Sequence, residues 1–135
     1  MTKQAKTRTR LVVAIALLLV LAGCVITPSL PPGTYAATIT EEDTIDFQGE
    51  WELTLVEGNH YSFARNGSIV DEGRYTLTQD QIVFTYEKGP YACAGQETYI
   101  YKWAFDEKAL TLTTVEDECP DRNRVITAHA WSSQD

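Results

Sequence analysis

Positive charge is scarce in most of this chain. All 19 acidic residues follow position 24, but only 7 of the 11 lysines and arginines do, so the chain from residue 24 onward carries a net charge of −12. Nucleic-acid binding needs lysines and arginines opposite the phosphates, so this balance excludes DNA and RNA as partners. Histidines are also few, and His60 and His129 belong to no catalytic Ser/His/Asp spacing. We therefore expect no catalytic residue, no cofactor and no enzymatic activity.

Long hydrophobic runs are missing as well. The longest extends over residues 11–22, and a bilayer-spanning helix needs about 20 apolar residues. Four basic side chains precede this run and a small residue follows it, which is the layout of an export signal. The sequence thus predicts a signal peptide over residues 1–23.

The four residues that end the signal, Leu21 to Cys24, resemble the lipobox of bacterial lipoproteins. The resemblance implies that Cys24 is lipidated and becomes the mature N-terminus, anchored to the membrane in the extracytoplasmic cell envelope. A diacylglyceryl group would supply the two chains that stable anchoring requires. An acidic domain is repelled by anionic headgroups, so the lipid must hold it there. Residues 24–32 then form a lipidated, Pro-rich tether, and residues 33–135 form the domain.

Cysteines are rare too, and only Cys93 and Cys119 remain beside Cys24. An even pair in an oxidising compartment is typical of a disulfide. A zinc site is the alternative, but it needs four ligands, and neither histidine lies at a metal-binding spacing from these cysteines. We predict a disulfide and no metal.

Helical periodicity is absent after residue 33, where apolar and polar residues alternate with period two. Short runs separated by turn residues predict eight strands, at 33–40, 50–56, 61–65, 69–77, 82–86, 98–105, 110–112 and 124–131. Tight turns make neighbours antiparallel, and closure removes the raw edges of such a sheet. The predicted fold is all-β, a single eight-stranded up-and-down barrel. Cys93 and Cys119 follow the fifth and seventh strands and therefore lie at the same end, as a disulfide requires.

Several motifs in order resemble the lipocalins and short bacterial lipoproteins with lipocalin-like domains. Gly49-Glu50-Trp51 resembles the G-x-W motif, and Gly73-Arg74-Tyr75, a Tyr/Trp strand over 99–103 and a late cysteine follow it. The resemblance implies that an arginine near the last strand, Arg124 or Arg122, packs over Trp51 at a closed end of the barrel. Our strand count instead places Trp51 at the end with the longer loops.

Aromatic residues dominate the side chains that alternation directs inward. Such walls fit a pocket for a small hydrophobic ligand, and they also fit a barrel filled by its own side chains. The candidate ligand-binding residues are Tyr61, Phe63, Tyr75, Phe84, Tyr86, Tyr99, Tyr101 and Trp103.

The sequence is compatible with two functions. The first is a membrane-anchored barrel that binds a small hydrophobic ligand. The second is a packed barrel that acts on a protein partner, for example as a hydrolase inhibitor, through the acidic connection at 41–46 and the disulfide-linked loops. A negatively charged rim would suit a basic partner.

Overall fold

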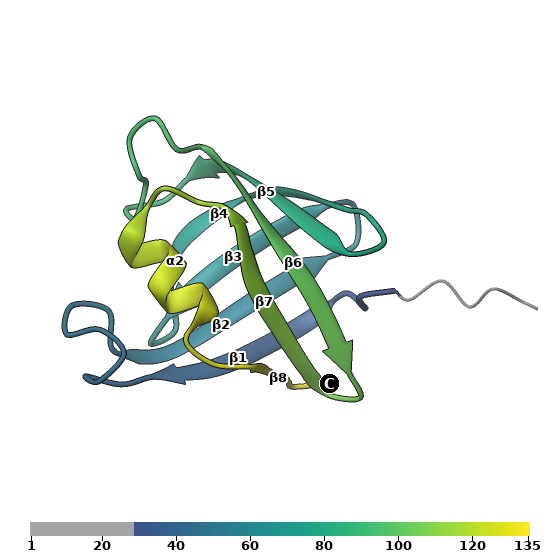
Figure 1. Ribbon diagram of the computed structural model, residues 1–135, viewed down its shortest axis with the longest axis horizontal. Coiled ribbons are helices and arrows are strands. Elements are labelled where there is room, and N and C mark those ends of the chain that lie inside the picture. Colours follow the sequence, from purple (N-terminus) through teal and green to yellow (C-terminus); the bar gives the residue numbers. More distant parts are fainter. Residues whose placement is uncertain (1–28) are drawn as a thin grey trace, which may run out of the picture.

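A computed structural model describes residues 29–135 of the chain. The predicted signal peptide and the lipidation of Cys24 lie outside these residues. Eight antiparallel strands close into a barrel in sequence order, and one short helix lies across one end (Figure 1). The elements are Gly33–Ile39 (β1), Gly49–Val56 (β2), His60–Arg65 (β3), Ser68–Leu77 (β4), Gln81–Lys88 (β5), Thr98–Asp106 (β6), Ala109–Glu116 (β7), Pro120–Thr127 (α2) and Trp131–Ser133 (β8). The predicted fold class is confirmed.

The barrel is closed by its shortest strand. β8 pairs with β1 through Tyr35 opposite Ser133, and with β7 through Leu110 opposite Trp131. Trp131 is fully buried, so this short strand contributes a large side chain to the core as well as two sets of backbone hydrogen bonds. The closed sheet leaves no long unpaired edge, which is the reason the sequence predicted a barrel.

The end of the barrel where the chain enters is filled. Leu30 is buried in the core, and the hydroxyl of Tyr35 donates a hydrogen bond to the carbonyl of Pro31 at 2.6 Å. The last residues of the predicted tether are therefore packed onto the barrel. The C-terminus lies at this same end, and α2 with the long loops lies at the other (Figure 1).

The predicted eighth strand over 124–131 is wrong. Residues Pro120–Thr127 form α2, and only Trp131–Ser133 pair as a strand. Pro120 stands at the first helical position, where its missing N–H costs nothing and its fixed φ suits a helix, and Asp121 carries negative charge in the first turn. Val125 and Ile126 point from α2 into the core. The segment predicted as a strand is thus a helix with a buried inner face.

Two irregularities in β4 reshape the barrel wall. Phe63 pairs with Asp71 and Ala64 pairs with Ile69, so Val70 is an extra residue in a β-bulge. Both Val70 and Asp71 are buried as a result. A second shift in register occurs at Gly73.

Gly73 has no room for a side chain, so we expect Gly73→Ala to destabilise the fold. A methyl group there would lie 2.0 Å from the carbonyl oxygen of Thr85 and 3.0 Å from the amide of Glu87, both of them backbone atoms of β5. Overpacking against backbone typically costs about 1–3 kcal/mol. Urea unfolding of the variant measures the loss, and an unchanged midpoint would contradict the close approach of β4 and β5.

Candidate functional site: a pocket at the mouth of the barrel

A pocket of about 300 Å³ opens at the end of the barrel that carries α2. Its walls come from the loops after β1 and β5, from residues of β2, β3 and β4 near this end of the barrel, and from α2. It is bordered by Phe47, Trp51, Phe63, Val70, Asp71, Pro90, Tyr91, Ala92, Cys93, Cys119, Asp121, Arg122, Val125 and Ile126. Most of this lining is apolar, and its charged members are Asp71, Asp121 and Arg122.

The loop after β5 is held over the mouth by aromatic contacts. The ring of Tyr91 lies 5.5 Å from that of Phe47 and 6.1 Å from that of Trp51, measured between centroids. Its amide donates to the carbonyl of Val70 at 3.1 Å, and its hydroxyl accepts a hydrogen bond from Arg65 at 3.0 Å. These contacts fix the loop after β5 as one wall of the pocket.

Trp51 does not pair with Arg124. Its indole N–H donates to the carbonyl of Phe47 at 2.8 Å, and Arg124 is exposed on α2. Arg65 stands opposite Trp51 in the sheet, and it donates to the carbonyl of Gln48 and lies over the Phe47 ring. Trp51 lines the open end of the barrel, so the strand count was correct and the closed end implied by the resemblance was wrong.

Only one of the eight predicted ligand-binding residues, Phe63, borders the pocket. Six of the others are buried in the core, and Tyr86 is half-buried with its hydroxyl on the carbonyl of Gly89. Ring contacts fill the barrel: Tyr61 and Phe84 have centroids 4.8 Å apart, and Phe84 stacks on Tyr99 at 5.1 Å. Aromatic side chains therefore fill the interior of the barrel, and the cavity lies at its mouth.

Arg122, which borders the pocket, forms a buried ion pair with Asp117. Arg122 of α2 donates to Asp117 through Nε at 3.0 Å and through Nη2 at 2.8 Å, and the two side chains are 8% and 0% exposed. Asp117 also accepts from the hydroxyl of Tyr101 and from the amide of Cys119. Burial disfavours the charged guanidinium, but the bonds and charge of Asp117 outweigh it and raise the pKa of Arg122. Burial and Asp117 together raise the pKa of Tyr101.

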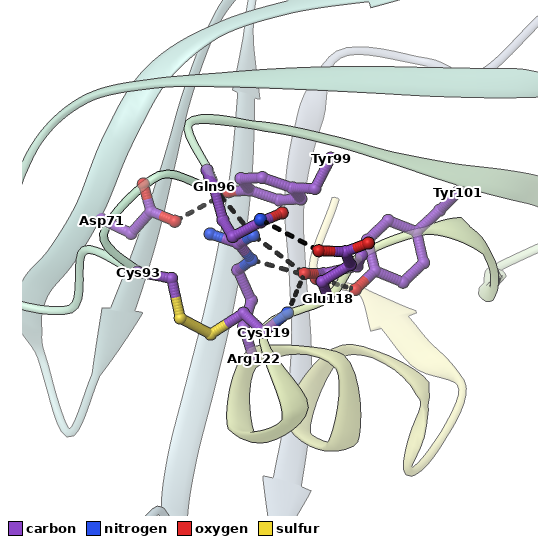
Figure 2. The surroundings of a disulfide bond; sticks show 9 residues. Asp71, Cys93, Gln96, Tyr99, Tyr101, Glu118, Cys119 and Arg122 are labelled. Atoms are coloured by element: carbon purple, nitrogen blue, oxygen red, sulfur yellow. Dashed lines mark hydrogen bonds and ion pairs between the residues drawn. A yellow bond between two sulfur atoms is a disulfide. The ribbon is translucent and has the colours of Figure 1, made fainter.

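Asp71 is the second buried carboxylate of the site. It is 4% exposed and accepts hydrogen bonds from the hydroxyls of Tyr61 at 2.8 Å and Tyr99 at 2.7 Å. The guanidinium carbon of Arg122 lies 3.7 Å from the centre of the Tyr99 ring, so Tyr99 contacts both polar groups, Asp71 through its hydroxyl and Arg122 through the face of its ring (Figure 2). Burial raises the pKa of the Asp71 carboxyl, although the two hydroxyls and the charge of Arg122 act against the shift.

The raised pKa of Asp71 gives a testable dependence of stability on pH. The folded protein holds this proton at a pH where the unfolded chain has lost it, so stability falls as pH rises from the unfolded to the folded pKa, by at most about 1.4 kcal/mol per pH unit. The stability of Asp71→Asn relative to the unmodified chain should therefore rise over that interval. Urea unfolding of both proteins across acidic pH measures this difference, and a constant difference would show that Asp71 keeps its ordinary pKa.

The predicted disulfide between Cys93 and Cys119 is confirmed, with the two Cα atoms 6.1 Å apart. It joins the loop after β5 to the residue that immediately precedes α2. The carbonyl of Gln96 in the same loop accepts a hydrogen bond from Arg122 at 3.2 Å. Two independent links therefore hold opposite walls of the pocket together.

Sequence reasoning missed most of the pocket. Phe47 and Tyr91 lie in loops, where alternation says nothing about direction, and Val125 and Ile126 lie in the helix that was predicted as a strand. The inward direction of Asp71 could have been predicted, because it lies four residues before the inward Tyr75 and alternation places both on the same face of β4.

No family model, curated protein or solved structure matches this chain. Within residues 29–135, no helix is long and apolar enough to span a bilayer. The same residues contain no cluster of three His, Cys, Asp or Glu side chains that could hold a metal ion.

Proposed function

We propose that this protein is a membrane-anchored, non-enzymatic lipoprotein that binds a small, mainly hydrophobic ligand in the mouth pocket of its barrel. The observation that carries the proposal is the pocket itself, a cavity of about 300 Å³ with aromatic and aliphatic walls and a few polar groups on one side. Ligand sites in proteins are typically of this size and composition. Because the rest of the barrel is filled, we assign binding to the mouth, where Phe63 is the only one of the eight predicted aromatic residues.

The position of the pocket fits a tethered protein. The chain enters β1 at the end opposite α2, where Leu30 and Pro31 pack against the barrel. If Cys24 carries the lipid, fewer than ten residues separate the anchor from the barrel, and the mouth faces away from the membrane. A ligand would then enter from the aqueous side of the envelope.

The experiment is a titration of the purified full chain with the neutral lipophilic dye N-phenylnaphthylamine, whose fluorescence rises in apolar surroundings. We expect saturable binding, with the strongest quenching at Trp51, which borders the pocket, whereas Trp103 does not border it and Trp131 only contacts its lining residue Phe63. Trp51→Phe should therefore reduce the quenching and retain the dye, whereas Trp103→Phe should retain both.

Two neighbouring alanines provide a matched pair of variants. Both alanines are exposed on the same loop, but Ala92 borders the pocket and Ala94 does not. Ala92→Trp should fill the mouth and weaken dye binding at least about tenfold, which corresponds to about 1.4 kcal/mol. Ala94→Trp should leave binding unchanged. Equal effects of the two variants, or no dye binding by the unmodified chain, would contradict the proposal and favour the alternative of a filled barrel that acts on a protein partner.

A further inference from the structure

The volume of the mouth pocket limits the size of its ligand. A protein cavity of about 150 Å³ accepts one benzene molecule, so the pocket of about 300 Å³ corresponds to about two fused rings. Phe63 marks its boundary toward the barrel interior. The Phe63 ring lies 5.6 Å from that of Phe84 and 5.8 Å from that of Trp131 between centroids, and both of these side chains are fully buried. A long chain therefore has no path from the pocket into the barrel.

The walls of the pocket are fixed, so the cavity does not deepen when a ligand binds. Cys93 and Cys119 both border it, and the disulfide between them joins two of its walls. The amide of Tyr91 is bonded to the carbonyl of Val70 at 3.1 Å, and its ring packs against that of Phe47. Preorganised sites of this kind change little on binding, so the ligand must match the cavity as it stands.

Aromatic rings form much of the pocket surface, which favours a flat ligand over a flexible one. Four of the lining side chains are aromatic: Phe47, Trp51, Phe63 and Tyr91. Rings pack against one another in offset or edge-to-face arrangements that add to the gain from apolar burial. A rigid ring system also loses less conformational entropy on binding than an alkyl chain of the same volume.

The loops and the helix at this end of the barrel carry strong negative charge. Residues 40–48, 89–97 and 117–130 contain eight aspartates and glutamates but only two arginines. Charges of one sign around a cleft with apolar walls attract ions of the opposite charge. The mouth therefore favours a cation and repels an anion.

The charged residues that border the cavity act in the same direction. Arg122 is paired with both oxygens of Asp117, so its positive charge is compensated. Asp121 is exposed on the rim and forms no ion pair within residues 29–135. Asp71 is the other carboxyl group at the cavity, and a cation nearby would stabilise its ionised form.

We propose, on the basis of the function assigned above, that the ligand of the mouth pocket is a compact cation with two fused aromatic rings and an alkylammonium group. The rings lie against Trp51, Phe63 and Tyr91, and the ammonium group lies at the rim beside Asp121. The naphthalene of N-phenylnaphthylamine occupies the cavity in the same way, with its phenyl ring at the opening. Long-chain lipids and aromatic acids are the excluded ligands.

The first test varies the number of rings. Benzylamine, naphthylmethylamine and anthracenylmethylamine share one head group, and each displaces N-phenylnaphthylamine from the full chain in competition titrations. These are repeated with Ala92→Trp so that only displacement from the pocket is counted. We expect affinity to rise at least about tenfold from one ring to two, and no more than about twofold from two rings to three, because the third ring stays outside the cavity.

The second test varies the charge on one ring system. At neutral pH and low salt, naphthylmethylamine should bind at least about tenfold more tightly than naphthylacetate, with the neutral naphthylmethanol between them. High salt should reduce the difference between the two ions, because screening weakens the interactions of exposed charges. The affinity of naphthylmethanol should change little with salt.

Two aspartates provide matched variants for the charge. Asp121 and Asp106 are both exposed, but Asp121 borders the pocket and Asp106 lies at the opposite end of the barrel, where β6 ends. Asp121→Asn should weaken binding of naphthylmethylamine about threefold, the effect of an exposed ion pair, and leave naphthylmethanol unchanged. Asp106→Asn removes the same charge and should change neither affinity.

The outcomes separate this inference from the function on which it depends. Affinity that keeps rising from two rings to three, or naphthylacetate bound as tightly as naphthylmethylamine, would overturn the compact cation while intact dye binding leaves the pocket function standing. Equal effects of Asp121→Asn and Asp106→Asn would overturn the placement of the ammonium group at the rim. Failure of the dye and of every aromatic probe would overturn both proposals.

Discussion

Replacing Asp117 by alanine is expected to cost about 3–5 kcal/mol of folding free energy, the typical loss when one partner of a buried ion pair is removed. The Asp117 side chain is fully buried and that of Arg122 is 8% exposed, so water cannot replace the lost carboxylate. The variant would leave the guanidinium without its counter-charge, and it would also remove the acceptor of the Tyr101 hydroxyl and of the Cys119 amide. Urea unfolding of the full chain measures the loss.

Glu116→Ala is the matched control for this prediction. Glu116 is an acidic residue on the same segment, but its side chain is exposed, so its removal should cost no more than about 0.5 kcal/mol. The double variant Asp117→Leu with Arg122→Met removes both charges, and it should recover part of the loss because no isolated charge stays buried. Equal losses in Asp117→Ala and Glu116→Ala would show that the pair does not stabilise the fold.

The barrel was predictable because alternation records which side chains face the core. Leu53, Phe84 and Tyr101 are all fully buried on the faces that period two assigns to them. The disulfide was predictable for a related reason, since counting strands in a meander places the loops of Cys93 and Cys119 at one end. Both inferences use only the local geometry of strands and the order of the turns.

The pocket was not predictable in the same way. Alternation identifies inward residues, but it does not say whether neighbouring rings fill the space between them, and here the stacked Phe84 and Tyr99 do so. The cavity also depends on Val125 and Ile126 of α2, a segment that was predicted as a strand. A proline directly after Cys119 was the available signal for a helix start.

The resemblance to lipocalins was informative for the fold and misleading for one residue pair. An arginine does lie close to the Trp51 end of the barrel, but it is Arg65 of β3 that stands opposite Trp51, and Arg122 of α2 packs on Tyr99. The choice among arginines depends on whether residues near the C-terminus form a strand or a helix. Motif spacing alone does not contain that information.

Removing the disulfide is the second large perturbation, and we expect Cys93→Ser with Cys119→Ser to lose about 3.5 kcal/mol of stability. The bond closes a loop of 26 residues, and the figure is the entropy that the unfolded chain regains when this loop opens. Because the bond joins the loop after β5 to the start of α2, its loss should also separate two walls of the pocket and weaken binding of N-phenylnaphthylamine.

Reduction supplies an independent arm of the same experiment. A reductant should lower the urea midpoint of the unmodified chain to that of the double serine variant, and it should leave the variant itself unchanged. The remaining links between the two walls, from Arg122 to Gln96 and Asp117, determine how much of the pocket survives. If reduction lowers stability without changing dye affinity, these hydrogen bonds hold the mouth in place and the covalent bond acts through the unfolded chain alone.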